Sequence, residues 1–206
     1  MNMKKSIRWS SGVTIIEMVT TIVVLGIITI GLGISLRTVM YHYQDDSVLR
    51  DVHHYGNSVM RDITKEISLA RFIRKDEVNG FSRLRLTKFD LNGTPTNLTV
   101  TANKGEGILF DNKNPLNGNL KFPTKGRFRD QNQRLITLNK FQIKQANAIR
   151  PNLARFASSS WDIYLDIGVE TKNSPGGTLK EVIHFHKSVF MPNNYLTQSQ
   201  NNNFAG

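Results

Sequence analysis

The chain has 206 residues, of which 39% are hydrophobic and 21% charged, so it can form one folded domain with appendages and is not wholly disordered. The lack of cysteine excludes a disulfide scaffold, a thiolate metal site and a cysteine nucleophile. A formal charge of +11, from 27 Lys and Arg against 16 Asp and Glu, favours anionic partners in general without naming one.

The N-terminal region has the features of a single membrane span. The run Met18–Leu36 contains no formal charge, and at about 1.5 Å of helical rise per residue it extends over roughly 28 Å, close to the thickness of a bilayer core. Cations but no acidic residue occur among positions 1–12. By the positive-inside rule, we expect the N-terminus in the cytoplasm and everything after Arg37 outside it.

Three interpretations of this N-terminus compete: a cleaved secretory signal, a plain anchor and a more specialised segment. A secretory signal needs a cleavage site of small residues, and Gly33–Leu36 is a poor match to one. A plain anchor has no use for Glu17, whose carboxylate costs about 2–3 kcal/mol inside a membrane. A carboxylate that merely snorkels from the end of an anchor is the weaker interpretation, because the spacing of Glu17 from Gly12 and the basic leader is specific. An ionisable group inside a span indicates a function and a partner.

A short motif surrounds Glu17: a basic leader, a glycine, and a glutamate five residues later, at Lys4, Lys5, Gly12, Val13 and Glu17. This stretch resembles the class III leader and N-terminal motif of type IV pilins and of the pseudopilins of type II secretion systems. In those families the leader ends in Gly, the next residue begins the mature chain, and the fifth mature residue is Glu.

Gly26 also matches a frequent glycine of these families. The helix-kinking Pro of many major pilins would fall at Ile34, and Val13 replaces the commoner Phe. Both departures are ordinary among minor pilins and pseudopilins. The resemblance covers about the first 40 residues.

The resemblance implies that prepilin peptidase cuts after Gly12 and methylates the new amine of Val13. It also implies that the Glu17 carboxylate of one subunit meets the Val13 amine of a neighbour. Such a pair offsets two desolvation penalties and sets the register between subunits.

Beyond the span, the apolar period predicts that the helix continues. Apolar residues recur at spacings of three and four, at Val48, Val52, Tyr55, Val59, Ile63, Ile67 and Ala70. We therefore predict one helix from about Val13 to Arg74, transmembrane over 13–36 and amphipathic over 37–75. Asn79-Gly80 is expected to mark a stop and a turn, and Gly56 to weaken the helix.

Downstream the period changes to two, which predicts strands. The expected strands lie at 83–87, 98–102, 134–145, 161–169 and 179–190, with Ser174–Gly177 as the turn of a terminal hairpin. The predicted fold class is α+β: a long N-terminal helix, whose first half is transmembrane, packed on a mostly antiparallel β-sheet head over 76–196. This arrangement is pilin-like. A flexible tail is expected over 197–206.

Two patterns could carry metal chemistry, and we expect neither to do so. His184 and His186 lie on one face of a strand, but the sequence indicates no nearby acidic ligand, so we interpret them as solvent-facing. The stretch Asp111–Asn119 resembles a calcium loop, but Lys113 occupies a ligand position, so we interpret it as turn-rich. No catalytic triad, carboxylate pair or nucleotide-binding loop appears, so we expect no enzyme activity, no catalytic residue, no metal site and no cofactor.

A basic segment at 121–155 contains nine cations against the single acid Asp130. Seven of them form the candidate set for binding an anion or DNA: Lys121, Lys125, Arg127, Arg129, Arg134, Lys140 and Lys144. Cations interleaved with phenylalanines suit a groove for a nucleic-acid backbone. The alternative is a basic face toward acidic neighbours, or solubility alone, with the phenylalanines packed inward. We favour this alternative, because clustering along the sequence is not clustering in space.

The sequence therefore predicts a structural minor subunit, a minor type IV pilin or a type II secretion minor pseudopilin, which acts in filament assembly and protein transport. The resemblance implies three kinds of partner: prepilin peptidase, other pilin or pseudopilin subunits, and inner-membrane lipid. It implies a single-pass protein of the bacterial inner membrane, with its head outside the cytoplasm, that later enters a pilus or pseudopilus. Two alternatives stay open: a DNA-binding minor pilin of natural transformation that uses segment 121–155, and an unrelated single-span envelope protein.

Overall fold

The computed structural model describes residues 14–90, 92–124, 134–147, 150, 153–174 and 177–203. The predicted leader over 1–12 and Val13 lie outside the described residues. The chain divides into two compact units, Met1–Asp46 and Ser47–Gly206.

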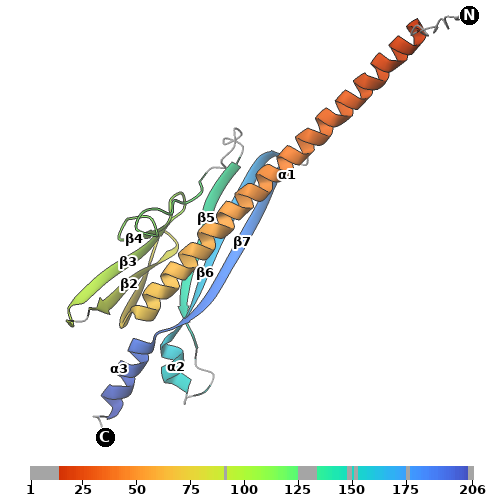
Figure 1. Cartoon of the computed structure of the whole chain (residues 1–206). Coiled ribbons are helices and arrows are strands. Elements are labelled where there is room, and N and C mark those ends of the chain that lie inside the picture. The colour runs from red at the N-terminus through yellow and green to blue at the C-terminus, as the bar shows by residue number, and fades with distance from the viewer. Residues whose placement is uncertain are drawn as a thin grey trace, which may run out of the picture. The chain divides into compact units, whose positions relative to one another are not determined.

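Helix α1 spans Ile15–Leu69 and belongs to both units (Figure 1). In the first unit every residue from Thr14 to Tyr43 is exposed, so apolar side chains cover all sides of the helix. A helix packed on a protein core instead keeps its apolar residues on one face. This part of α1 is long and apolar enough to cross a membrane, and the predicted apolar helix is thus confirmed from Ile15 onward.

In the second unit α1 is amphipathic, as the spacing predicts. Every residue of the predicted stripe is buried: Val48, Val52, Tyr55, Val59, Ile63, Ile67 and Ala70. The first six lie on α1, and Ala70 directly follows the helix. One face of this half of α1 therefore lies on the core of the head.

The predicted end of the helix at Arg74, and with it the boundary at residue 75, is wrong. Helix α1 ends at Leu69, and Phe72–Val78 form strand β1. This strand pairs along its whole length with β2, Phe81–Phe89. The ladder satisfies the backbone of the stretch and outweighs its weak helical preference.

The predicted turn at Asn79-Gly80 is confirmed, but it joins β1 to β2 and does not stop a helix. Both residues have positive φ, 54° and 79°, as a tight two-residue hairpin turn requires. The head therefore begins with a hairpin that the predicted boundary cut in two.

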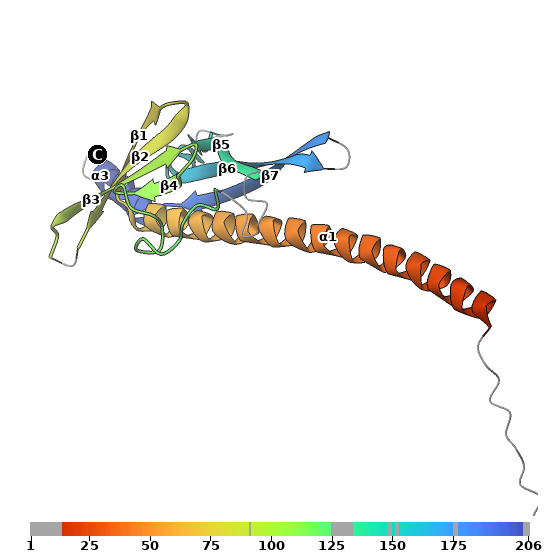
Figure 2. The same cartoon turned by 90° about the horizontal axis from the view of Figure 1, so that it is seen from above.

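The head contains two antiparallel sheets where the sequence predicted one (Figure 2). The first has the order β1-β2-β3-β4 and adds β3, Pro95–Asn103, and β4, Gly107–Phe110. The second has the order β5-β6-β7, with bounds Arg134–Gln145, Ser160–Ser174 and Gly177–Phe190. All five predicted strands are confirmed, β1 and β4 were not predicted, and the fold class is α+β with antiparallel sheets.

Alternate residues of β6 point into the core, as the period of two predicts. Ile163, Leu165 and Ile167 are fully buried, and their neighbours on β6 face the other way. Asp162 pairs across the strands with Lys144 on β5 and with Ser188 on β7, which makes the outer face polar.

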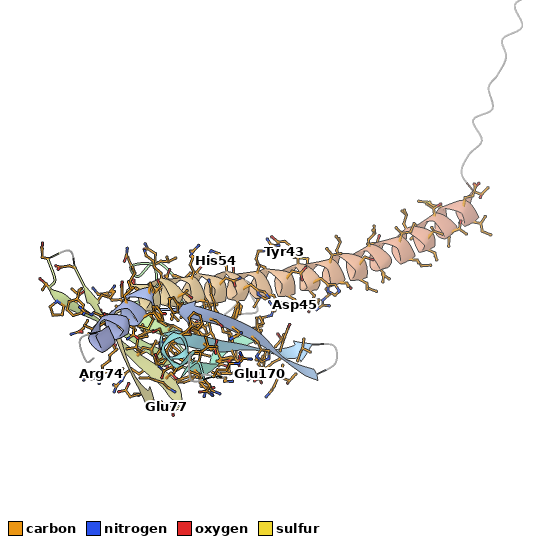
Figure 3. All side chains as sticks on the ribbon, turned by 90° about the horizontal axis from the view of Figure 1, so that it is seen from below. Tyr43, Asp45, His54, Arg74, Glu77 and Glu170 are labelled. Atoms are coloured by element: carbon orange, nitrogen blue, oxygen red, sulfur yellow. The ribbon has the colours of Figure 1, made fainter. Side chains whose placement is uncertain are left out.

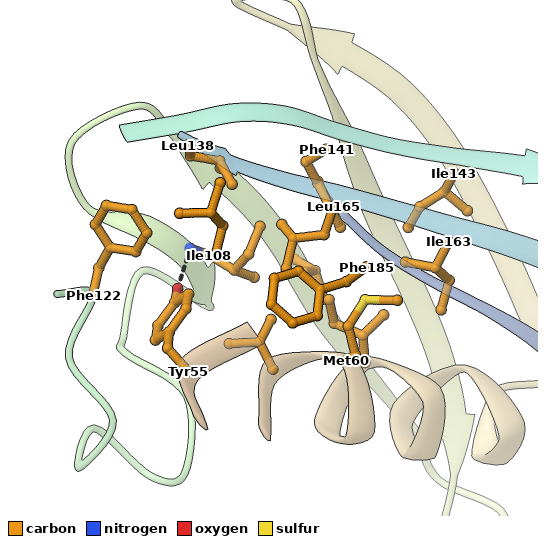
Figure 4. Packing of buried hydrophobic residues seen from close by; sticks show 14 of the residues in the cluster. Tyr55, Met60, Ile108, Phe122, Leu138, Phe141, Ile143, Ile163, Leu165 and Phe185 are labelled. Atoms are coloured by element: carbon orange, nitrogen blue, oxygen red, sulfur yellow. Dashed lines mark hydrogen bonds between the residues drawn. The ribbon is translucent and has the colours of Figure 1, made fainter. Parts of the chain in front are cut away.

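The core lies between α1 and the two sheets (Figure 4). Tyr55 on α1 and Phe185 on β7 are among its aromatic residues. A Cβ atom built on Gly56 would lie 2.2 Å from Cζ of Phe185, so the helix approaches this ring more closely than any other residue type permits. Gly56 is thus a packing requirement, and the prediction that it merely weakens the helix missed this role.

Two short helices complete the head. Helix α2 spans Ala154–Ser158, and α3 spans Pro192–Asn203. Residues 197–203 of the predicted flexible tail are helical, and residues 204–206 lie outside the described residues. The side-chain amides of Asn193 and Asn194 donate to the carbonyls of Leu69 and Arg71 at 3.2 and 3.0 Å, so α3 supplies partners for carbonyls at the end of α1.

Candidate functional site

Glu17 forms a capping box with Thr14 at the start of α1. The Thr14 N–H and hydroxyl both donate to Oε2 of Glu17 at 3.0 Å, and the Glu17 N–H donates to the Thr14 hydroxyl at 3.3 Å. Such reciprocal bonds satisfy backbone donors that have no partner within the helix, and a negative charge here complements the helix dipole. The Thr-x-x-Glu pattern is a known signal for a helix start, and the sequence interpretation of Glu17 overlooked it.

Gly12 and Val13, the predicted processing residues, lie outside the described residues and stay a prediction. The described part of the candidate assembly site is thus Glu17, exposed and bonded within its own chain, followed by the exposed apolar turns of α1. This geometry leaves the carboxylate accessible to a second chain.

The candidate anion-binding set is only partly described, since Lys125, Arg127 and Arg129 lie outside the described residues. Lys140 and Lys144 project from the outer face of β5, where they stand opposite Asp166 and Asp162 of β6. These two cations therefore share their face with carboxylates, which lowers its positive charge.

The remaining described members of the set lie elsewhere. Arg134 begins β5 opposite Thr171. Lys121 lies in the coil after β4 and lines a hollow of about 510 Å³ together with Glu106. The described members do not gather into a single cationic groove.

Of the phenylalanines in or next to the basic segment, Phe122 and Phe141 are buried, as the favoured alternative predicts, and Phe128 lies outside the described residues. Phe156 is 54% exposed and stacks on Phe190 with ring centroids 5.0 Å apart, which corrects that prediction for this residue. The two buried rings belong to the core and are not stacking platforms for a nucleic acid.

His184 and His186 face solvent, as predicted, but each has an acidic neighbour, contrary to prediction. Nδ1 of His184 lies 2.8 Å from Oδ1 of Asp166, and Nε2 of His186 lies 3.5 Å from Oδ1 of Asp162. The aspartates belong to β6, so only strand pairing brings them beside the histidines. Within the described ranges no three potential ligands gather around a metal position.

The loop after β4 is turn-rich, as predicted. Positive φ angles occur at Asp111, Asn112, Leu116, Asn117 and Gly118. Asp111 accepts the Thr99 N–H at 2.7 Å, so its carboxylate braces the loop against β3.

The first sheet carries a cluster of cations that the sequence interpretation missed. We call it the arginine patch: Arg74, Arg83 and Arg85 of the first sheet, together with Arg71, which directly precedes β1. Arg74 lies directly opposite Arg85 in the β1–β2 ladder, and Arg83 lies opposite Asp76. Once β1 is recognised as a strand, the Asn-Gly turn is enough to predict this register.

Asp76 partly neutralises the arginine patch. Nε of Arg83 donates to Oδ1 of Asp76 at 2.9 Å, and a second guanidinium nitrogen of Arg83 contacts Oδ2. These bonds from Arg83, together with the charges of Arg83 and Arg85, hold the pKa of Asp76 below its ordinary value. The carboxylate is therefore ionised at neutral pH, and the patch keeps a net positive charge.

Comparisons with protein-family models, curated proteins and solved structures find no match to this chain.

Proposed function

We propose that this chain is a membrane-anchored structural subunit of a type IV pilus or a type II secretion pseudopilus, as a minor pilin or minor pseudopilin. In this proposal prepilin peptidase removes residues 1–12 and methylates the amine of Val13. The subunit resides in the bacterial inner membrane, with its head outside the cytoplasm, until it joins a filament of related subunits.

The observation that carries the proposal is the exposure of the first part of α1. The large apolar side chains between Ile15 and Leu36 are 51–85% exposed. Burying so much apolar surface is strongly favourable, at about 25 cal/mol per Å², so this part of α1 requires lipid or neighbouring helices. A subunit that exchanges lipid for the helices of other subunits meets this requirement in both of its states.

Glu17 supplies the second argument. Its bonds to Thr14 satisfy hydrogen-bonding groups, but among the residues that the structure describes no cation pairs with its negative charge. Inside hydrocarbon such a charge is costly, and a cation from another chain would lower the cost. In the proposal that cation is the methylated amine of Val13 in the neighbouring subunit.

Two variants separate pairing between subunits from capping within the chain. Glu17→Gln keeps an acceptor for the Thr14 N–H, because glutamine also serves in a capping box, but it has no charge. Thr14→Ala removes the hydroxyl and keeps the carboxylate. The measurement is the fraction of the protein recovered in sheared filaments, with membrane levels as the control.

We expect Glu17→Gln to reach the membrane normally and to enter filaments about tenfold less than the unaltered chain, whereas Thr14→Ala assembles almost normally. Assembly of Glu17→Gln at the level of the unaltered chain would refute the pairing. Intact-mass analysis of protein from cells with and without prepilin peptidase tests the processing. Retention of residues 1–12 in both strains would favour the unrelated envelope protein.

A further inference from the structure

The arginine patch is joined to exposed apolar side chains at the end of α1. The guanidinium carbon of Arg71 lies 5.7 Å from the ring centroid of Phe72 and 5.2 Å from that of Phe89. Phe72 and Phe89 are both partly exposed, at 47% and 41%. Nε of Arg71 donates to the Thr197 hydroxyl at 3.1 Å, which holds the guanidinium beside α3. A fixed arginine over exposed aromatic rings is typical of the energetic centre of a protein interface.

Among the described residues of the head, the arginine patch has more cations than acidic partners. Arg74 and Arg85 stand opposite each other across two strands, an arrangement that destabilises a hairpin. Asp76 lies 3.7 Å from Arg85 and is already bonded to Arg83. Within the described parts of the chain, no carboxylate lies within ion-pair distance of Arg71 or Arg74. The patch therefore favours a ligand of opposite charge.

The rim of the patch indicates a protein ligand and not a nucleic acid. Leu69 and Leu196 are 49% and 59% exposed, and with Arg71 and Phe89 they line a hollow of about 370 Å³. Aliphatic side chains offer nothing to phosphates, whereas they bury apolar area against a protein. The ligand should therefore combine carboxylates with large apolar side chains.

This chain presents such a segment itself. Residues 39–46 of α1 contain exposed Val39, Met40, Tyr41 and Tyr43, followed by Asp45 and Asp46. The sequence has no Lys or Arg between Arg37 and Arg50. Figure 3 labels Tyr43 and Asp45 on α1 and Arg74 on the head. We call residues 39–46 the acidic segment.

We propose that the arginine patch of one copy binds the acidic segment of a second copy, with Arg71 and Arg74 facing Asp45 and Asp46 and with apolar residues in contact beside them. The two surfaces differ, so the contact is heterologous and joins two copies of this chain only where they are neighbours in the filament. It rests on the proposed function, because it gives a filament subunit a second contact apart from Glu17. Opposite charges at its rim steer the copies together and set their orientation.

Cysteine cross-linking tests the contact, because the chain has no cysteine of its own. Copies that carry Asp46→Cys are expressed together with copies that carry Arg74→Cys, as full chains in the cell, and are oxidised. A disulfide requires Cα atoms about 4.4–6.8 Å apart, so its formation reports direct contact. The matched control replaces Arg74→Cys by Lys180→Cys, which removes another exposed cation, on β7 of the other sheet.

We expect a disulfide-linked dimer from the Asp46→Cys and Arg74→Cys pair, with about tenfold less from the control pair. Equal yields would refute the contact. A cross-link from Arg74→Cys to a different subunit, with no cross-link between copies of this chain, would also refute the proposal that a second copy binds the arginine patch.

Charge reversal gives a second, independent measurement, on purified full chains in detergent micelles. Arg74→Asp and Asp46→Arg should each weaken self-association about tenfold, and a mixture of the two variants should recover it. Both residues are exposed, so the thermal unfolding of each variant should match that of the unaltered chain. No recovery in the mixture, or loss of binding to an oligothymidine strand with no change in self-association, would overturn the proposal.

The two proposals can fail separately. If the cross-link between copies still forms in Glu17→Gln, the contact of the arginine patch is supported even if pairing through Glu17 is wrong. If assembly depends on Glu17 but the specific cross-link does not form, the proposed filament function is supported and the contact of the arginine patch is rejected.

Discussion

The hydroxyl oxygen of Tyr55 accepts a hydrogen bond from the Ile108 N–H at 2.8 Å, which ties α1 to strand β4 inside the core (Figure 4). Tyr55 is 1% exposed, and its ring meets that of Phe122 edge-on at 5.1 Å. Gly107 precedes the donor with φ of 78°, and a Cβ there would lie 2.3 Å from the hydroxyl. The short strand β4 is therefore held by a side chain of the helix as well as by β3.

Replacing Tyr55 by Phe should destabilise the head by about 1–3 kcal/mol, because the buried N–H of Ile108 loses its partner. Urea unfolding of the full chain in micelles measures the change. Tyr195→Phe is the matched control, because the Tyr195 hydroxyl makes no hydrogen bond within the described chain, and its effect should stay within about 0.5 kcal/mol. Equal stability of both variants would show that water replaces the lost bond.

The same tyrosine predicts a loss of stability at alkaline pH. Burial raises the pKa of Tyr55 to about 12, only partly opposed by the bond from Ile108, whereas the unfolded chain titrates at its ordinary value of 10.0. The unfolded state thus releases its proton first, so the contribution is fully present below pH 10 and is lost as the pH rises toward 12. The loss should approach about 3 kcal/mol, and Tyr55→Phe should lack it. Identical pH profiles for the two proteins would refute the assignment.

Gly56→Ala should destabilise the head by about 1–3 kcal/mol, although alanine is the better helix former. The added methyl group would collide with the ring of Phe185, which is itself 9% exposed and has little room to move. Asn57→Ala, at the next and exposed helix position, should be neutral or slightly stabilising. Thermal unfolding by circular dichroism measures both variants. A gain in stability from Gly56→Ala would mean that the ring shifts without cost.

The last helix should contribute to stability through its two asparagines. Asn193→Ala combined with Asn194→Ala removes two donors to the carbonyls at the end of α1, and we expect a loss of about 1–2 kcal/mol. Hydrogen exchange should show faster opening of the last turn of α1, with little change near Tyr55. An unchanged exchange rate at Leu69 and Arg71 would contradict the capping role.

Helix α1 shows how far a local pattern extends and where it stops. The spacing of Val48, Val52 and Val59 predicted which face is buried, because a helix with one apolar stripe packs in one orientation only. The helix was predicted to extend to Arg74, yet the stretch from Phe72 pairs with β2. Whether this stretch forms a strand depends on the residues of β2 beyond the turn, and these lie outside the segment whose periodicity predicted the helix.

The candidate sites divide in the same way. The sequence shows both the five-residue spacing of Glu17 from Gly12 and the Thr-x-x-Glu capping pattern. The acidic neighbours of His184 and His186 come from β6, and the arginine patch exists because Arg74 is opposite Arg85. Both depend on strand register, which a single sequence specifies weakly unless the turn is recognised.

The sequence by itself determined the exposed apolar helix, the amphipathic helix that follows it, and the five strands with clear alternation. Each of these elements follows from the periodicity of apolar residues in a single segment, because that periodicity indicates which face of the segment is buried. Only the tertiary structure decided that the head has two sheets, that Gly56 admits the ring of Phe185, and that Asn193 of α3 donates to a carbonyl at the end of α1. These outcomes depend on distances between segments far apart in the chain, and packing sets such distances collectively.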